Sequence, residues 1–303
     1  MKIIRAQHLG MCFGVRDAVA LAEESVRERP VTVLGQLVHN QTVLDRLAKQ
    51  GVRFADHPES VETSDVIITA HGASERRKKK AVDAGLRLID STCPLVAHAH
   101  RAIHMLVAQG FHPIVIGRPG HVEVNGMTED LSECDIIQTA ADLDTLRSRP
   151  RFGVCAQTTQ PIDRVLALVD QLRKRFPESE VKFLDTVCQP TKQRQSAAIN
   201  LAGQVDVVVV VGGPNSNNTR ELRETCRLHC ARVHQVQSGK EICDEWFHPE
   251  DTVGITAGTS TPDETINQVE QAIWSSNEPA HFVMQSKNIT REGACEESVP
   301  LAV

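Results

Sequence analysis

The chain has 303 residues, with 33 Lys and Arg against 39 Asp and Glu, nine Cys and no Tyr. A hydrophobic fraction of 41% and a charged fraction of 24% exclude the disordered, collagen-like and coiled-coil classes, and the net charge of −6 argues against a nucleic-acid partner. The apolar run 205–211 is far shorter than the roughly 18 residues that a membrane span needs. The first residues lack the apolar core of a signal peptide, so a cytoplasmic protein without a membrane partner is expected.

Short β-branched runs alternate with amphipathic helical stretches, which is typical of α/β proteins with mostly parallel sheets. The predicted strands lie at 2–4, 31–34, 66–69, 88–90, 113–116, 136–139, 152–156, 182–184, 207–211, 233–236 and 252–256. The predicted helices lie at 15–28, 41–50, 74–84, 95–109, 162–175, 191–203, 219–229 and 262–275. Residues 276–303 turn polar and are predicted to be a C-terminal tail with a short strand at 281–284.

A weak internal repeat divides the chain. Residues 88–93 and 183–188 both run from a predicted strand into a cysteine that precedes a predicted helix, and Cys12 precedes a helix in the same way. The intervals from Cys12 to Cys93 and from Cys93 to Cys188, 81 and 95 residues, are the size of a domain. This spacing predicts three similar α/β modules, each delivering one cysteine to a common centre: 14–92, 93–186, and 1–13 together with 187–275.

These three cysteines are candidate metal ligands. The positive field at a helix N-terminus is expected to lower the pKa of a thiol there and to suit it to bind metal. Three thiolates without a fourth ligand suit a [4Fe–4S] cluster with one open iron, and zinc held by three Cys and one His is the alternative. The other cysteines are predicted to be structural, with two of them four residues apart on one helix: Cys134, Cys155, Cys226, Cys230, Cys243 and Cys295.

Polar side chains also follow the predicted strands, at the edge where parallel α/β sheets bind their ligands. Three histidines each follow a strand, and as hydrogen-bond donors they can hold a diphosphate together with four hydroxyl and amide side chains. The set comprises His39, His71, His121, Ser216, Asn217, Asn218 and Ser260. The chain has neither a GxGxxG nor a Walker A lysine loop, so binding of a nucleotide phosphate is disfavoured.

Helix capping is a second explanation for some of these polar residues. Thr261 begins a capping box with Pro at the first helical position, Thr261-Pro262-Asp263-Glu264. Asn218 and Ser74 are further predicted caps. Capping and anion binding are compatible, so the predicted diphosphate site stands beside these caps.

Glu123 and Thr158 are the predicted catalytic residues. Glu123 stands two residues after His121 in a glycine-flanked loop, and Thr158 lies at the end of a predicted strand. A carboxyl group beside a hydroxyl forms a proton relay when both are buried near a leaving group.

Nine segments carry a resemblance that runs in order over residues 10–262. They are 10–15 (GMCFGV), 38–40 (VHN), 70–72 (AHG), 90–96 (DSTCPLV), 120–124 (GHVEV), 157–159 (QTT), Cys188 with Thr191, 215–218 (NSNN) and 257–260 (AGTS). They resemble the successive motifs of the 4-hydroxy-3-methylbut-2-enyl diphosphate reductase family, which acts last in the methylerythritol phosphate route to isoprenoids.

The resemblance implies three modules in a pseudo-threefold arrangement around a central [4Fe–4S] cluster held by Cys12, Cys93 and Cys188, with its fourth iron open to the substrate's hydroxyl. It implies that Glu123 donates a proton, with Thr158 beside it. The implied reaction is reductive dehydroxylation to isopentenyl and dimethylallyl diphosphate, with electrons from NAD(P)H through ferredoxin or flavodoxin. The implied diphosphate contacts are His39, His71, His121, Thr158, Ser216, Asn217, Asn218 and Ser260.

The chain departs from the family pattern at three places. Val122 stands where the family usually has Pro, Asn217 where it has Ser, and Gln189-Pro190 where it has Tyr-Ala. A divergent paralogue acting on another allylic diphosphate is therefore one alternative function. A non-catalytic iron–sulfur redox sensor and a zinc-dependent hydrolase are two others.

Overall fold

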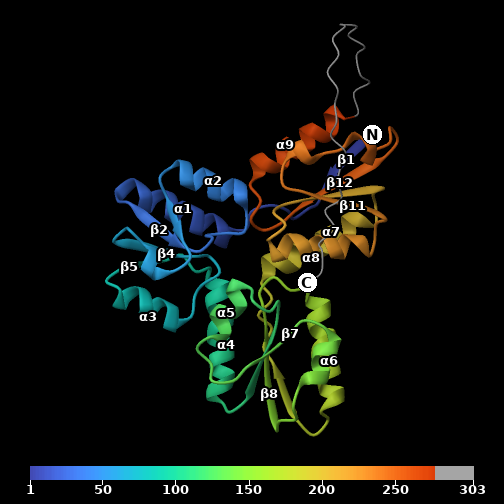
Figure 1. Cartoon of the computed structure of the whole chain (residues 1–303). Coiled ribbons are helices and arrows are strands. Elements are labelled where there is room, and N and C mark those ends of the chain that lie inside the picture. Colours follow the sequence, from blue (N-terminus) through green and yellow to red (C-terminus); the bar gives the residue numbers. More distant parts are fainter. Residues whose placement is uncertain (277–303) are drawn as a thin grey trace.

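Three parallel sheets form the framework of the protein in the computed structural model, which describes residues 1–276 (Figure 1). The predicted strand at 281–284 lies outside the described residues. Each sheet has four strands, and every strand pair within the described chain is parallel. The predicted α/β class with three similar modules is therefore confirmed.

The first sheet has the strand order β3-β2-β4-β5. Its strands are β2 (Val31–Leu34), β3 (Arg53–Ala55), β4 (Asp65–Ile68) and β5 (Arg87–Asp90). The accompanying helices are α1 (Phe13–Glu28), α2 (Gln41–Lys49) and α3 (Glu75–Asp83), with the short 3₁₀ helix η1 (Pro58–Ser60).

The second sheet has the same kind of order, β7-β6-β8-β9. Its strands are β6 (His112–Ile116), β7 (Asp135–Ile137), β8 (Arg151–Ala156) and β9 (Glu180–Phe183). The accompanying helices are α4 (Pro94–Ala108), α5 (Val122–Thr128) and α6 (Ile162–Arg175), with η2 (Ala140–Thr145).

The third sheet, β1-β12-β10-β11, joins the N-terminal strand to the last third of the chain. Its strands are β1 (Lys2–Arg5), β10 (Val207–Val211), β11 (Arg232–Val236) and β12 (Thr252–Ala257). The accompanying helices are α7 (Gln189–Ala202), α8 (Asn217–Arg227) and α9 (Asp263–Ser275), with η3 (Gly239–Glu241) and η4 (Asp244–Trp246). Each predicted module contains all the strands of one sheet, so we propose 14–92, 93–186, and 1–13 with 187–275 as the module boundaries.

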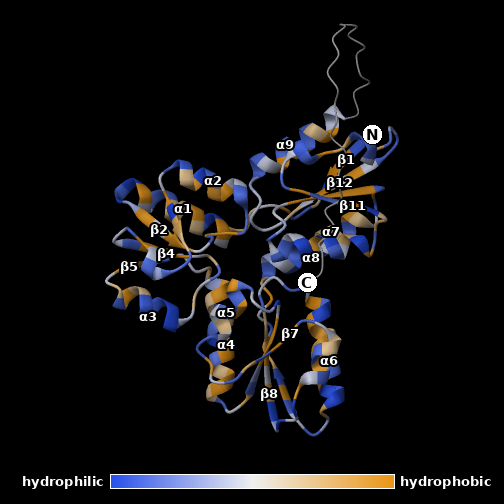
Figure 2. Cartoon of the chain, viewed as in Figure 1, coloured by the Kyte–Doolittle hydropathy of each residue, from blue (hydrophilic) through white to orange (hydrophobic). Residues whose placement is uncertain are grey.

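Each sheet is buried on both faces, which explains the continuous apolar runs. All residues of β10 are fully buried, and they pack against α9 on one face and against α7 and α8 on the other. Figure 2 shows the same pattern, with hydrophobic strands inside and helices that are hydrophilic on their outer faces. Helix-covered parallel sheets of this kind bury their strands on both sides. Within residues 1–276, no helix combines the length and the apolar character of a membrane span.

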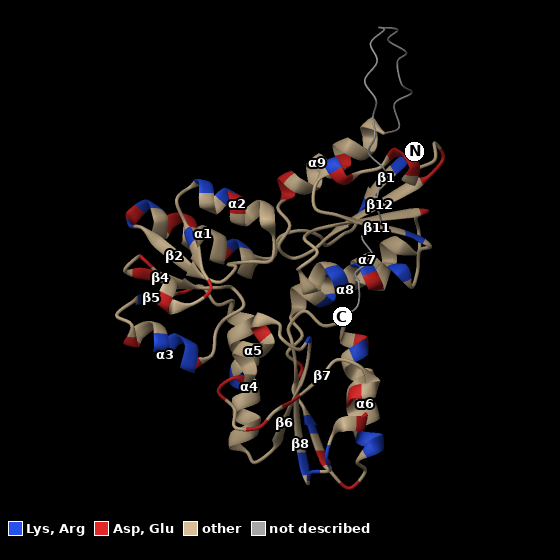
Figure 3. Cartoon of the chain, viewed as in Figure 1, with Lys and Arg blue, Asp and Glu red and all other residues tan. Residues whose placement is uncertain are grey.

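Charged residues are spread over the outer helices of the three modules, with a run of basic residues on α3 (Figure 3). The loops where the modules meet are nearly free of them in this view (Figure 3). The meeting point of the modules is therefore where buried polar chemistry is expected.

Some local expectations were wrong. Strand β3 and helix α5 were not predicted, because β3 has three residues and α5 has seven, too few for a periodic pattern. Cys230 lies beyond the end of α8 at Arg227, so it does not share a helix with Cys226. The predicted cap at Ser74 is confirmed, since its side chain accepts a hydrogen bond from the Arg77 N–H.

The expected caps at Thr261 and Asn218 are also wrong. Helix α9 has Pro262 as its N-cap, and the Thr261 hydroxyl donates to the Val211 carbonyl at 3.0 Å. Helix α8 is capped by Ser216 instead of Asn218. Thr261 bonds to β10 and Asn218 bonds to the Thr259 N–H, and local sequence does not reveal such contacts between distant segments.

Candidate active site where the three modules meet

The three candidate cysteines occupy the same position in their modules. Cys12, Cys93 and Cys188 are the N-cap residues of α1, α4 and α7. No side chain caps these helices, so each thiol stands beside free N–H groups. The expectation that each cysteine directly precedes a helix is confirmed.

A backbone hydrogen bond ties each cysteine to a polar loop at the end of a strand. The Cys93 N–H donates to the carbonyl that precedes His71, and the Cys188 N–H donates to the carbonyl of Thr158 itself. The three bonds are Cys12 N to Thr259 O, Cys93 N to Ala70 O and Cys188 N to Thr158 O, each 3.0 Å long. The bonds of Cys93 and Cys188 cross from one module to the next, so the backbone holds these cysteines and the polar loops together where the modules meet.

Burial governs the acidity of Cys93 and Cys188. It raises the pKa of Cys188 to about 11, although hydrogen bonds from Thr191 act to lower it. Burial also raises the pKa of Cys93, although hydrogen bonds from the N–H groups at the start of α4 act to lower it. The charges of Cys12 and Glu123 raise both pKa values further. The expected lowering of the pKa by the helix field is thus outweighed for Cys93 and Cys188. Backbone contacts bring the groups together: Gly14, two residues after Cys12, lies against the Cys93 Sγ, and the Thr158 backbone bonds both Cys188 and Glu123.

The donor set is chemically suited to an iron–sulfur cluster, whose irons are held by cysteine thiolates. The three thiols come from the starts of three separate helices, unlike the closely spaced ligands of a structural zinc site. Gly14 keeps space beside Cys93, because a Cβ there would lie 2.4 Å from the Cys93 Sγ.

Four further free cysteines of the described chain lie away from this centre. Cys155 is fully buried inside β8, and Cys226 is fully buried under α8. Burial raises the pKa of Cys134, Cys155 and Cys226 to about 12, so these thiols stay protonated. They are inert packing groups, as is typical of buried cysteines. Cys230 lies nearby and packs in the same apolar cluster as Cys226.

The three predicted histidines come together from two modules. The rings of His39 and His71 are stacked with centroids 4.3 Å apart, and the His121 ring meets them edge-on at 5.1 and 5.5 Å. Burial lowers the pKa of all three, to about 3 for His121. The cluster is therefore uncharged at neutral pH, and each ring offers one N–H donor.

The hydrogen-bond pattern assigns the tautomer of His121. This residue caps α5, and its Nδ1 accepts the Glu123 backbone N–H at 3.1 Å. In the neutral ring the proton is then on Nε2, which is free to donate to a ligand. The Nε2 of His71 is buried and has no hydrogen-bond partner among the described residues.

Glu123 is a buried carboxyl group at the start of α5, where a loop was expected. Its side chain is 1% exposed, and its Oε1 accepts the Thr158 backbone N–H at 2.6 Å. Burial raises the pKa of Glu123 to about 7, although hydrogen bonds from Thr158 act against the shift. A carboxyl group with this pKa holds a proton at neutral pH and can release it.

The hydroxyl and amide residues come from the third module. Ser260 donates its hydroxyl to the His39 carbonyl at 3.2 Å, which joins this module to the histidine cluster. Asn218 accepts the Thr259 N–H at 3.0 Å through Oδ1, and its Nδ2 is buried without a partner in the part of the chain described. An unpaired buried donor is costly in a folded protein, so a bound acceptor is expected here.

A small cavity of about 30 Å³ lies among these groups. Its lining includes every predicted diphosphate contact except Thr158, whose backbone N–H instead holds Glu123, and it adds residues that the sequence analysis missed. The lining residues are Val15, Val38, His39, His71, His121, Glu123, Thr159, Ser216, Asn217, Asn218, Thr259 and Ser260. Thr159 and Thr259 lie in the segments QTT and AGTS that carry the resemblance, beside the predicted residues Thr158 and Ser260.

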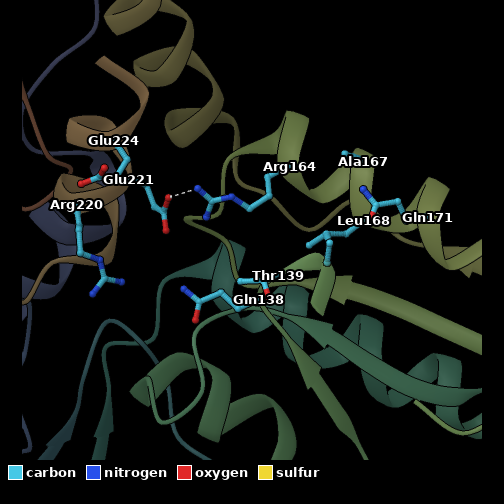
Figure 4. A pocket seen from close by; sticks show the side chains of 10 residues that line it. Gln138, Thr139, Arg164, Ala167, Leu168, Gln171, Arg220, Glu221 and Glu224 are labelled. Carbon is cyan, nitrogen blue, oxygen red and sulfur yellow. Dashed lines mark ion pairs between the residues drawn. The ribbon is translucent and has the colours of Figure 1, made fainter. Parts of the chain in front are cut away.

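A wider pocket of about 610 Å³ lies beside the cavity, between η2 and α6 on one side and α8 on the other. Figure 4 shows Arg164 and Glu221 pointing toward each other across it, with the Arg164 Nη2 and Glu221 Oε2 3.0 Å apart. Arg220 also lines this pocket and donates to the Asn217 Oδ1 at 2.8 Å. The hydrogen bond between Arg220 and Asn217 therefore links a residue of this pocket to a residue of the cavity.

The fold and the site together define a three-module α/β protein with a thiol-lined centre and an adjacent set of neutral donors. The chain belongs to the LytB protein family, whose profile matches residues 3–274. It is 36% identical over 277 residues to the 4-hydroxy-3-methylbut-2-enyl diphosphate reductase of Aquifex aeolicus, covering 89% of this chain and 95% of that protein. It is 34% identical over 302 residues to the reductase of the same name from Acinetobacter baumannii, covering 96% of each.

Two solved structures share the fold. The E-1-hydroxy-2-methyl-but-2-enyl-4-diphosphate reductase from Plasmodium falciparum superimposes with a TM-score of 0.84 at 26% identity, covering 89% of this chain and 87% of that one. A structure titled as (E)-4-hydroxy-3-methyl-but-2-enyl diphosphate reductase, the terminal enzyme of the non-mevalonate pathway, gives a TM-score of 0.65 at 35% identity, covering 90% and 99%. The resemblance inferred from the sequence motifs is confirmed.

Proposed function

We propose that the protein reduces (E)-4-hydroxy-3-methylbut-2-enyl diphosphate to isopentenyl and dimethylallyl diphosphate. The observation that carries the proposal is that three cysteines at helix N-cap positions come together with the buried Glu123 and the uncharged histidine cluster where the modules meet. The family membership and the names of the relatives support it. A [4Fe–4S] cluster held by Cys12, Cys93 and Cys188 would supply electrons one at a time and a Lewis-acidic iron for the substrate's hydroxyl.

The diphosphate would be held by neutral donors. The Nε2–H of His121, the orphaned Nε2 of His71 and the orphaned Nδ2 of Asn218 all belong to residues that line one cavity. Hydrogen bonds to a charged phosphate in a site shielded from water are stronger than those in solvent. His39, Thr158, Ser216, Asn217 and Ser260 complete the proposed set.

Glu123 would protonate the leaving hydroxyl. In the reaction the C–O bond breaks, two electrons and two protons enter, and the products are water and either dimethylallyl or isopentenyl diphosphate, according to which end of the allyl group receives the hydrogen. Thr158 holds the carboxyl group in place through its N–H. Burial of the site keeps water away from the reacting carbon. Electrons would come from a cytoplasmic ferredoxin or flavodoxin carrier supplied by NAD(P)H.

Anaerobic turnover tests the proposal directly. The purified protein, loaded with iron and sulfide, is mixed with the hydroxylated C5 diphosphate and a reduced viologen, and the products are separated by chromatography. We expect both isoprenoid diphosphates. A sample that contains the cluster and forms neither product would contradict the proposal and favour the redox-sensor alternative.

Turnover should depend on pH through Glu123. With a pKa of about 7, this group is about nine-tenths protonated at pH 6 and about one-tenth at pH 8. The proton-donating form is lost as pH rises, so turnover is expected to fall about tenfold from pH 6 to pH 8. Burial lowers the pKa of the three histidines below its ordinary value, to about 3 for His121, so His121 stays uncharged over this range. The check is kcat against pH at a fixed reductant potential, and a flat profile would argue against Glu123 as donor.

Arg220 is expected to strengthen binding of the diphosphate. Its guanidinium orients Asn217, whose Nδ2 donates to the Thr159 Oγ1 at 3.0 Å, and its charge and that of Arg118 both act on His121. An Arg220→Gln variant should bind pyrophosphate roughly five- to tenfold more weakly, the loss expected for about 1–1.5 kcal/mol. Isothermal titration calorimetry at low ionic strength measures this difference.

The control for that experiment is Arg223→Gln on the same helix. Arg223 pairs with Glu224 and does not line the cavity. Its removal subtracts the same charge, but the affinity of the Arg223→Gln variant for pyrophosphate should stay within about twofold of the unchanged protein, because Arg223 is half-buried against Glu224 and makes no contact with the cavity. Equal losses in the two variants would mean that only net charge matters.

A further inference from the structure

Arg194 is a buried cation beside the proposed cluster site. It lies on α7, six residues after Cys188, and in the described chain it is the only arginine in the buried class, at 8% exposed. Sequence analysis assigned it no role. Transfer of a guanidinium from water into the interior is unfavourable unless hydrogen bonds and an opposite charge compensate it.

Its hydrogen bonds join two segments that carry cysteines. The Nε and Nη2 groups donate to the Gly10 carbonyl at 2.9 and 2.7 Å, and Nη1 donates to the Pro190 carbonyl at 3.0 Å. Gly10 stands two residues before Cys12, and Pro190 stands two residues after Cys188. Arg194 therefore clamps the loop of Cys12 to the first turn of α7 across 184 residues of sequence.

The positive charge of Arg194 lies near the segments of the same two cysteines. All three hydrogen bonds go to backbone carbonyls, which leave the positive charge uncompensated. Burial lowers the pKa of Arg194, and the charges that oppose this shift are those of Cys12 and Cys188. Gly10 and Pro190 each stand two residues from one of these cysteines, so thiolates that bind a cluster at Cys12 and Cys188 would compensate this cation.

We propose that Arg194 is a positioning residue that fixes the spacing of the Cys12 and Cys188 segments and raises the reduction potential of the cluster they hold. This inference rests on the proposed function, since it presupposes the cluster. One electron passes from the carrier to the cluster and adds one negative charge, while Arg194 keeps its proton. A fixed cation in a poorly solvated site stabilises the reduced state over the oxidised state.

The test compares Arg194→Gln and Arg194→Lys with the unchanged protein. The readouts are iron and sulfide per chain and the midpoint potential from a redox titration followed by electron paramagnetic resonance. In Arg194→Gln we expect the equilibrium constant for reduction to fall about tenfold, which is about 59 mV for a one-electron couple. Arg194→Lys keeps the charge but not the fork of donors, so its potential should stay closer to that of the unchanged protein while its cluster is released about tenfold faster.

Arg16→Gln is the matched control. Arg16 is an exposed cation on α1 whose charge reaches Arg194, so its removal subtracts a nearby charge that water screens. Its potential and cluster content should be unchanged. Arg194→Gln with the potential and cluster content of the unchanged protein would overturn the inference. If Arg194→Gln folds without a cluster, the rate of cluster release from Arg194→Lys tests the inference. Release faster than from Arg16→Gln supports the role of Arg194 in holding the two cysteine segments, and equal release overturns it.

These outcomes are separable from failure of the proposed function. If the unchanged protein binds no iron–sulfur cluster, the proposed function fails before Arg194 is tested. If the unchanged protein binds the cluster and turns over, and the Arg194 variants behave like it, only the inference about Arg194 fails.

Discussion

Replacing any one of Cys12, Cys93 and Cys188 by serine is expected to abolish the cluster. Each cysteine is the N-cap residue of a different helix, and the remaining free cysteines of the described chain lie elsewhere in the fold, so no neighbouring cysteine can substitute for a lost ligand. Loss of an outer-shell partner alone costs about 10–100-fold in metal affinity, and loss of a ligand should cost at least that. Iron and sulfide per chain should fall by about tenfold or more, together with the visible absorption of the cluster.

Cys134→Ser is the matched control for these variants. Cys134 is a free thiol of the same intermediate exposure, but it packs beside the second sheet and away from the centre. Its replacement should leave iron and sulfide unchanged. Retention of a full cluster in any of the three ligand variants would contradict the assigned ligand set, and zinc in place of iron and sulfide would favour the hydrolase alternative.

Replacing Glu123 by glutamine is expected to stop turnover while the cluster remains. The amide matches the carboxyl group in size and can still accept the Thr158 N–H, but it has no acidic proton to give. General-acid catalysis contributes about 10²–10⁴-fold, so kcat should fall by about that factor. The measurement is turnover under anaerobic conditions beside the electron paramagnetic resonance spectrum of the cluster.

A second buried carboxyl group provides the control for Glu123. Glu221 is 4% exposed, its pKa is also raised by burial, and it pairs with Arg164 beside the wider pocket. Glu221→Gln should keep turnover within about twofold, although the lost ion pair lowers stability. A redox sensor would give the same metal-dependent response in both variants, whereas an enzyme distinguishes them.

Much of the fold could be predicted from local sequence. Strands such as Val207–Val211 are continuous apolar runs, and helices such as Ile162–Arg175 repeat their apolar residues with helical spacing. The predictions that failed concern elements of seven residues or fewer and helix caps whose side chains bond to distant segments instead. Helix α5 has seven residues with Gly126 among them. The Thr261 hydroxyl donates to the carbonyl of Val211, a strand residue fifty positions away, instead of capping α9.

The candidate site divides in the same way. Motif order identified the cysteines, the histidines and Glu123, because strand ends and helix starts are visible in the sequence. Arg220 and Arg194 were missed, since each lies inside a helix, where charged residues are ordinary. Their significance comes from the partners that they reach, Asn217 in one case and the Gly10 carbonyl in the other.

The sequence by itself determined the α/β class, the three-module division suggested by the cysteine spacing, and the residue types available for chemistry. Only the tertiary structure decided how those groups behave. Helix position alone predicts acidic thiols, yet burial raises the pKa of Cys188 to about 11, and burial raises the pKa of Glu123 to about 7. The reason is physical: periodicity is local, whereas desolvation and the pairing of Arg194 with a carbonyl 184 residues away depend on how the modules close on one another.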